Sequence, residues 1–118
     1  MTYTISWVLV ILAGINSTAG NYYLKKSQQN FDSFLGSLFS YEFFVGCLFY
    51  FFNVILFAYA LKELDVSKAY PVLASISFLS LSFLSFFLLD ESITTTKLIG
   101  LIFIIFGIFL LSNENLLT

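Results

Sequence analysis

Apolar residues fill four long stretches of the chain, and short polar segments separate them. The apolar stretches cover about residues 4–24, 40–61, 66–89 and 94–112, and the segments KKSQQNFD, KELD and DESITTTK divide them. A helix that crosses a bilayer needs about 20 mostly apolar residues, because each residue adds about 1.5 Å and the hydrocarbon core is about 30 Å thick. The pattern therefore predicts four transmembrane helices, which the short loops force to run antiparallel.

The many Phe, Ile and Tyr residues would also suit β-strands. A membrane barrel, however, needs at least about eight strands with alternating apolar and polar positions, and the chain shows no such alternation. We therefore predict an all-α integral membrane protein in which residues 1–118 form a single small four-helix bundle. The run FDSFLGSLF before Ser40 stays open, since it either lengthens the second helix or lies flat at the membrane interface.

Composition supports a membrane location and argues against several functions. The chain is 59% hydrophobic and only 10% charged, and its mean hydropathy is +0.95, so it lacks the polar surface of a water-soluble domain. It contains no histidine, basic patch, metal-ligand cluster or Gly-rich phosphate loop. We therefore expect no nucleic acid partner, no cofactor, no metal and no enzymatic activity. The expected location is the inner (plasma) membrane, as a multi-pass protein.

The first predicted helix ends in an unusually polar stretch, INSTAGNYYLKKS. Helical spacing puts small and polar residues of this stretch on one face, namely Ala13, Ser17, Gly20, Asn21 and Leu24. Such a face is unsuited to lipid, so we predict that it looks into the bundle interior or a wet cavity, where Ser17 and Asn21 can form hydrogen bonds. The alternative is that the stripe joins helices and binds no ligand.

The third predicted helix also has a polar face, which carries Tyr70, Leu73, Ser77 and Ser80. Serines in lipid commonly bond to carbonyls of their own helix or to a neighbouring helix. These serines therefore either join helices or line a cavity. We predict that Ser17, Asn21 and Tyr70 point into one shared interior cleft.

The fourth predicted helix carries Gly100 and Gly107, seven residues apart and thus within about 20° of the same face. Small residues on one face let helices approach closely in lipid. A chain this small is largely filled by its own side chains, so we expect a substrate path to need a dimer and predict that these glycines form its interface. The alternative is helix packing within one chain.

Three runs in this order, STAGNYYLKKS, LDVSKAYPVLAS and DESITTTKLIGLIFIIFGIFLL, resemble the drug/metabolite transporter superfamily. The chain is most similar to its four-helix members, which are the small multidrug resistance exporters and the paired subunits thought to flip aminoarabinose-phosphoundecaprenol. Ser17 stands where the exporters carry a glutamate, and Leu73 where they carry a tryptophan. Serine does not titrate near neutral pH, and the loss of the tryptophan removes a cation–π platform. The resemblance thus implies a lipid flippase subunit.

We therefore predict a small transporter subunit that flips or translocates a lipid-linked sugar of the polyprenyl-phosphate type, or a substrate with a similar polar headgroup. It would work as a homodimer, or as a heterodimer with a similar small membrane protein. The predicted substrate-binding residues are Asn16, Ser17, Asn21, Lys25, Tyr70, Leu73, Ser77 and Ser80. Two alternatives remain, a proton-coupled exporter of small molecules or cations that uses Glu42 for coupling, and a non-transporting accessory subunit.

Overall fold

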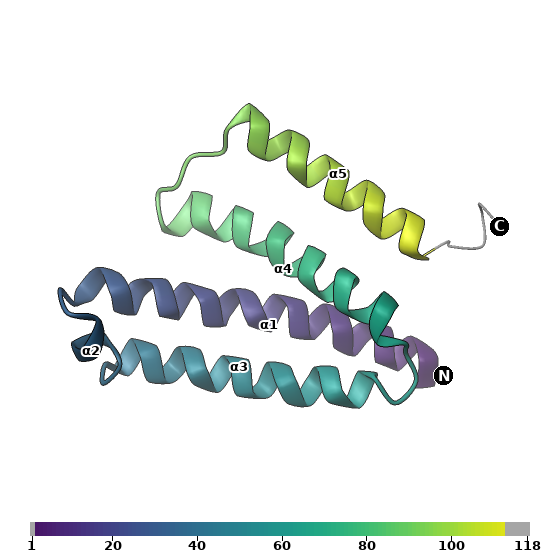
Figure 1. Cartoon of the computed structure of the whole chain (residues 1–118), viewed down its shortest axis with the longest axis horizontal. Helices are drawn as coiled ribbons and strands as arrows, with labels where there is room; N and C mark the ends of the chain where they lie inside the picture. Colours follow the sequence, from purple (N-terminus) through teal and green to yellow (C-terminus); the bar gives the residue numbers. More distant parts are fainter. Residues whose placement is uncertain (1, 113–118) are drawn as a thin grey trace.

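Helices make up almost all of the described chain, which contains no strand. The computed structural model describes residues 2–112, and these form α1 (Thr2–Asn30), α2 (Phe34–Ser37), α3 (Tyr41–Ala60), α4 (Val66–Leu88) and α5 (Thr95–Ser112) (Figure 1). Three of the helices, α1, α3 and α4, are long and apolar enough to cross a membrane, and the apolar part of α5 is somewhat shorter. The predicted fold class, a small all-α membrane bundle, is confirmed.

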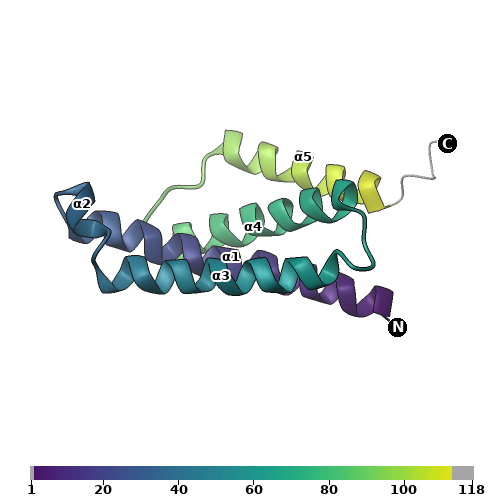
Figure 2. The same ribbon diagram turned by 60° about the horizontal axis from the view of Figure 1, so that its bottom comes forward.

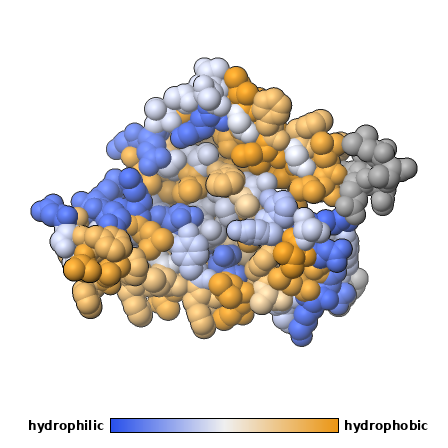
Figure 3. Space-filling view, in the orientation of Figure 1, coloured by the Kyte–Doolittle hydropathy of each residue, from blue (hydrophilic) through white to orange (hydrophobic). Residues whose placement is uncertain are grey.

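The long helices lie in a row in the order α3, α1, α4, α5 (Figures 1 and 2). Long helices that follow one another in the sequence run in opposite directions, so the row neighbours α1 and α4 run in the same direction. The molecule measures 52 × 36 × 19 Å, so its shortest dimension is about two helix diameters. Apolar side chains on the outer surfaces are correspondingly exposed, for example Phe51 (60%) and Phe103 (69%). These surfaces are suited to lipid. Figure 3 shows hydrophilic residues at the upper left and lower right of this face, and hydrophobic residues along its lower edge and over α5.

Two glycines let α1 pack closely against a neighbour on each side. A Cβ atom added at Gly14 would lie 2.7 Å from a side-chain carbon of Ile76 on α4, and one added at Gly20 would lie 3.3 Å from the carbonyl oxygen of Gly46 on α3. An added Cβ atom would clash at Gly14 and would be in unusually tight contact at Gly20, and small residues are what allow such close helix contact in lipid. As a result, α1 is the central helix of the row.

The first helix is longer than the prediction. It continues through the polar segment to Asn30 instead of ending near residue 24, because Lys and Gln are good helix formers and leaving the membrane does not require a helix to end. Its last turns contact the next elements. Gln28 donates a hydrogen bond to the Ser37 hydroxyl at 2.8 Å.

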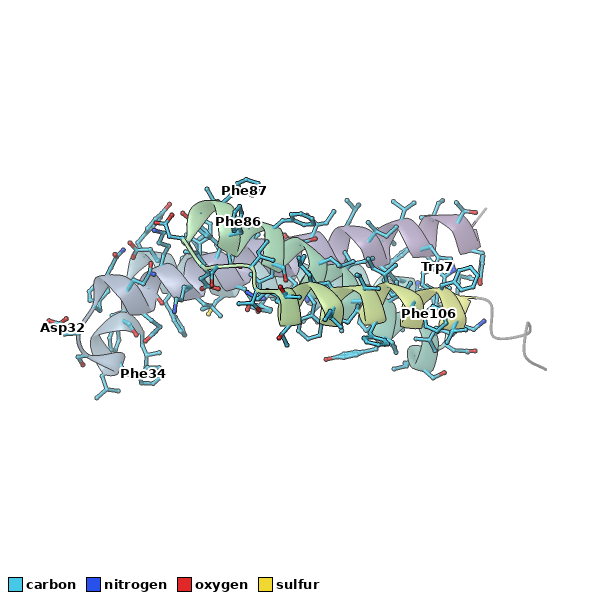
Figure 4. The ribbon with its side chains drawn as sticks, turned by 90° about the horizontal axis from the view of Figure 1, so that it is seen from above. Trp7, Asp32, Phe34, Phe86, Phe87 and Phe106 are labelled. Atoms are coloured by element: carbon cyan, nitrogen blue, oxygen red, sulfur yellow. The ribbon has the colours of Figure 1, made fainter. Side chains whose placement is uncertain are left out.

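The segment between the first two long helices forms a turn and the separate short helix α2, with Asp32 and Phe34 at the far end of the molecule (Figure 4). Ser40 adopts an extended conformation and its side chain caps α3 by accepting a hydrogen bond from the Phe43 N–H. Because this cap fixes the start of α3 at Tyr41, the segment does not lengthen that helix.

Candidate functional site

A polar pocket lies where α3 and α4 flank α1. Its volume is about 290 Å³, near the lower limit for sites that bind small molecules. No Asp, Glu, Lys or Arg is among the described residues that line it. These residues are Ser17 and Asn21 of α1, Tyr50 and Asn53 of α3, and Tyr70, Leu73, Ala74, Ser77 and Phe78 of α4. The pocket therefore offers uncharged hydrogen-bonding groups between apolar and aromatic side chains.

The pocket brings together five of the residues that the sequence singled out, namely Ser17, Asn21, Tyr70, Leu73 and Ser77. These residues lie in one pocket because the faces of α1 and α4 that carry them are turned toward each other. Ser17 and Leu73 are buried, whereas Tyr70 is 51% exposed and its ring contacts that of Phe57 on α3 at 6.1 Å between centroids. Their binding of a substrate stays a prediction.

Asn21 is held in place by the protein on both sides of its amide. Its Oδ1 accepts a hydrogen bond from the Tyr50 hydroxyl at 2.6 Å, and its Nδ2 donates to the Ser17 carbonyl oxygen at 3.1 Å. These bonds join α1 to α3 and hold the Tyr50 hydroxyl against the amide. Binding of a ligand by Asn21 stays a prediction.

Ser77 takes part in a polar contact between α1 and α4. Its hydroxyl donates to the Gly14 carbonyl oxygen at 3.2 Å, and the Thr18 hydroxyl donates to the Ser77 carbonyl oxygen at 3.4 Å. Both bonds cross from one helix to the other at the point where Gly14 permits close approach. Ser77 therefore lines the pocket and also holds its walls together, which is one of the two roles open to it from the sequence.

Three predicted substrate-binding residues lie outside this pocket, namely Asn16, Ser80 and Lys25. The Asn16 amide faces α3 and donates a hydrogen bond to the Phe49 carbonyl oxygen, so this residue joins two helices. Ser80 is partly buried but is not among the lining residues. Neither Asn16 nor Ser80 is among the residues that line the pocket, and a role of either in substrate binding stays a prediction.

Lys25 lies in a second, smaller pocket of about 180 Å³. It shares this pocket with Asn21 and Glu91, and the remaining lining residues are Leu81, Ser85 and Leu89. Because Asn21 also lines the larger pocket, the two pockets meet at this residue. Lys25 thus lies one helical turn after Asn21, beside the uncharged pocket.

Glu42 is outside both pockets. It lies in the first turn of α3 and accepts a hydrogen bond from the Asn30 amide at 3.0 Å. Eight residues separate it from Tyr50, or about 12 Å along the helix axis. Because Ser40 caps α3 just before it, Glu42 lies at the start of that helix.

Sequence reasoning missed Tyr50 and Asn53, the contribution of α3 to the pocket. The signal was present, since Asn53 is the one amide side chain in the otherwise apolar run FYFFNVILF. Tyr50 and Asn53 are three residues apart and therefore share a helix face. The prediction overlooked them because aromatic and apolar neighbours dominate that run.

Gly100 and Gly107 face open space on α5, where an added Cβ atom at either position would meet no atom within 4 Å. They do not mediate the contact of α5 with α4, so packing within one chain does not account for them. A contact with a second chain stays a prediction.

A larger pocket of about 400 Å³ lies between α1, α4 and α5 and has different chemistry. Apart from Lys68, its lining is apolar or aromatic, and Trp7 borders it at the N-terminal end of α1 (Figure 4). It has few groups that could orient a polar ligand, so the smaller polar pocket is the better candidate.

Comparison with known proteins places this sequence in a family. The model of the EamA-like transporter family matches residues 2–113. The chain belongs to this family. Its resemblance to the drug/metabolite transporter superfamily is thereby confirmed, and the chain is a multi-pass membrane protein of a transporter family.

One curated relative is the Uncharacterized protein y4nH of Sinorhizobium fredii (strain NBRC 101917 / NGR234). It is 37% identical over 109 residues, which cover 90% of this chain and 93% of the relative. No solved structure matches the chain significantly. The relative therefore agrees in length and sequence, while the choice of substrate has to be argued from the pocket.

Proposed function

We propose that this chain is a transporter subunit, not an enzyme, that moves a lipid-linked sugar or a similar polar headgroup across the inner (plasma) membrane as a homodimer or heterodimer. The observation that carries the proposal is the uncharged pocket of about 290 Å³ between α1, α3 and α4. Hydroxyl and amide groups beside aromatic rings suit a sugar, which presents many hydrogen-bonding groups and no charge.

The position of Lys25 supports the phosphate part of the same substrate. Lys25 follows Asn21 by four residues, and Asn21 lines both pockets. A sugar in the larger pocket would thus have a cation one helical turn away, at the polar end where a phosphate headgroup lies. Ammonium groups bind phosphate as point charges, and the apolar outer surfaces of the helices offer a path for the tail.

Proton-coupled export of cations has less support. That mechanism needs a titratable group inside the substrate pocket, and no carboxylate is among the described residues that line it. Glu42 lies at the start of α3, and Glu91 is exposed at the edge of the smaller pocket. We therefore expect no resistance to quaternary ammonium compounds or guanidinium from this chain.

Reconstituted vesicles test the proposal. The probe is a fluorescent short-chain polyprenyl phosphate hexose, and the measurement is the rate at which it becomes accessible to a quencher on the opposite leaflet. We expect the wild-type protein to accelerate this movement and Lys25→Gln to slow it several-fold, up to about tenfold, because a charge-assisted bond to phosphate is lost.

Lys26→Gln is the matched control, since the Lys26 ammonium lies 5.8 Å from the centre of the Tyr22 ring and outside both polar pockets. It should move the probe at close to the wild-type rate. Proton-driven uptake of a hydrophobic cation at appreciable rates, with no movement of the lipid-linked sugar, would overturn the proposal.

A further inference from the structure

The Asn53 side chain of α3 is unusual among the polar groups of the pocket. It lines the pocket, yet its Oδ1 atom is buried and has no hydrogen-bond partner. Within residues 2–112, it is the one buried side-chain nitrogen or oxygen atom in this condition. A buried acceptor without a partner is unfavourable, so its presence in a membrane helix calls for a physical reason.

The other amides of this region already have partners. Asn21 bonds to both the Tyr50 hydroxyl and the Ser17 carbonyl, and Asn16 bonds to the Phe49 carbonyl. The Ser77 hydroxyl donates to Gly14. These bonds hold the three helices together. The Asn53 oxygen, in a residue that lines the pocket, is a buried acceptor without a partner.

We propose that the Asn53 carboxamide oxygen accepts a hydrogen bond from a hydroxyl or amide N–H of the bound substrate, and that it thereby selects uncharged headgroups that carry such a donor. This inference rests on the proposed function, since it names a group in that same pocket that recognises the substrate. A site built to accept a hydrogen bond rejects an analogue without the donor, because the protein acceptor is then left buried and unpaired.

The tyrosine hydroxyl beside it strengthens the selection. Tyr50 lies one turn before Asn53 on α3, and its hydroxyl hydrogen is used in the 2.6 Å bond to Asn21. It therefore presents an oxygen lone pair to the pocket. A ligand with several hydroxyl groups can donate to both oxygens, whereas a quaternary ammonium ion has no hydrogen to donate.

Side-chain amide NMR of the full-length protein in lipid nanodiscs, labelled with ¹⁵N-asparagine, tests the inference directly. The probes are octyl β-glucoside, which is neutral and rich in donors, and octyltrimethylammonium, which has no donor. We expect the Asn53 amide signal to shift with the glucoside and to stay in place with the cation. The Asn30 amide, which bonds to Glu42 at the end of the bundle, is the internal control and should not move with either probe.

A variant adds a quantitative test. Asn53→Leu should weaken glucoside binding at least tenfold, followed at the Asn21 side-chain amide, which lines the same pocket. Each octyl monodeoxyglucoside lacks one hydroxyl group, and for wild type one member of the series should bind more weakly than octyl glucoside. For Asn53→Leu, loss of that same hydroxyl should not weaken binding further, because its hydrogen bond is already absent. Asn53→Leu should also unfold at the same temperature as wild type or higher when no probe is present.

Several outcomes would overturn the inference. If the Asn53 signal does not shift with the glucoside, or if it shifts with the cation, then Asn53 does not select ligands that carry a donor. A lower unfolding temperature of Asn53→Leu with unchanged glucoside affinity means that the residue is structural. Movement of polyprenyl-linked sugar in vesicles that is insensitive to Asn53→Leu sinks this inference alone, whereas glucoside binding at Asn53 without any such movement sinks the proposed function alone.

Discussion

At the scale of single residues, three asparagines near the middle of the bundle have three different environments. Asn16 donates to a backbone carbonyl of α3, Asn21 bonds to Tyr50 and to its own helix, and the Asn53 oxygen is unpaired in the pocket. The same type of side chain therefore joins helices at Asn16, positions a pocket wall at Asn21, and leaves a buried acceptor without a partner at Asn53. The surroundings of each amide decide between these roles, because the chemistry of the three amides is identical.

Asn16→Leu should destabilise the fold without changing which ligand binds. Hydrogen bonds between membrane helices contribute about 0.6 kcal/mol on average and up to about 1.7 kcal/mol, and this substitution removes the bond to Phe49. The free energy of unfolding in mixed micelles measures the effect. Asn30→Leu is the control, because its bond to Glu42 is exposed and should contribute close to nothing. Equal stabilities of the two variants would contradict the helix-joining role of Asn16.

Tyr50→Phe should impair transport more than stability. The substitution keeps the ring but removes the hydroxyl that donates to Asn21, so the Asn21 amide and the pocket wall lose their fixed arrangement. We expect transport of the polyprenyl probe to fall by about tenfold, the size of one hydrogen bond to a positioned group. Tyr22→Phe lies outside the pocket and should transport normally. Similar rates for both variants would leave the Tyr50–Asn21 bond without a functional role.

At the scale of the elements, α1 owes its central position to glycines that face different neighbours. Gly14 meets α4 and Gly20 meets α3. They are six residues apart and thus about 120° apart around the helix. This spacing lets both neighbours approach α1 closely, and the pocket forms where their walls meet over Ser17 and Asn21. A single row of glycines on one face would favour one close neighbour instead.

Gly14→Ala and Gly100→Ala should change stability in opposite directions. Alanine has a helix propensity about 1 kcal/mol better than that of glycine, and at Gly100 the added Cβ atom meets nothing within 4 Å. At Gly14 it would lie 2.7 Å from Ile76, and such overpacking costs about 1–3 kcal/mol. Unfolding at high dilution in detergent should therefore rank Gly100→Ala above wild type and Gly14→Ala below it. The reverse order would refute the close contact of α1 with α4.

At the scale of the whole molecule, the row of helices has a shortest dimension of 19 Å. The last helix of the row, α5, packs appreciably against α4 alone among the described helices. Exposed apolar side chains cover α5, among them Ile102 at 65% and Phe103 at 69%. An edge helix of this kind has a free surface for lipid or for a second chain. The proposed dimer would use the part of that surface that carries Gly100 and Gly107.

Replacement of both glycines with leucine should weaken the dimer while the single chain folds normally. Each glycine faces open space within the chain, so the larger side chains clash only with a partner. Cross-linking yield in lipid at a fixed protein-to-lipid ratio measures the dimer, and the helical content by circular dichroism checks the fold. An unchanged cross-linking yield would remove these glycines from the proposed interface.

The sequence by itself determined the class of protein and much of the chemistry of its pocket. Apolar stretches long enough to span a membrane predicted the helical bundle. The polar stripe on α1 and the polar face of α4 predicted that five residues lie close together, namely Ser17, Asn21, Tyr70, Leu73 and Ser77. These inferences succeed because helical periodicity fixes which residues share a face of their own helix.

Only the tertiary structure decided which neighbour each face meets. It turned Asn16 toward α3, brought Tyr50 and Asn53 into the pocket, and kept Glu42 at the end of the bundle. The physical reason is that apolarity does not order helices in lipid, where every outer surface is equally apolar. Close packing at Gly14 and Gly20 and hydrogen bonds between helices set the order instead, and these depend on contacts between residues far apart in the sequence.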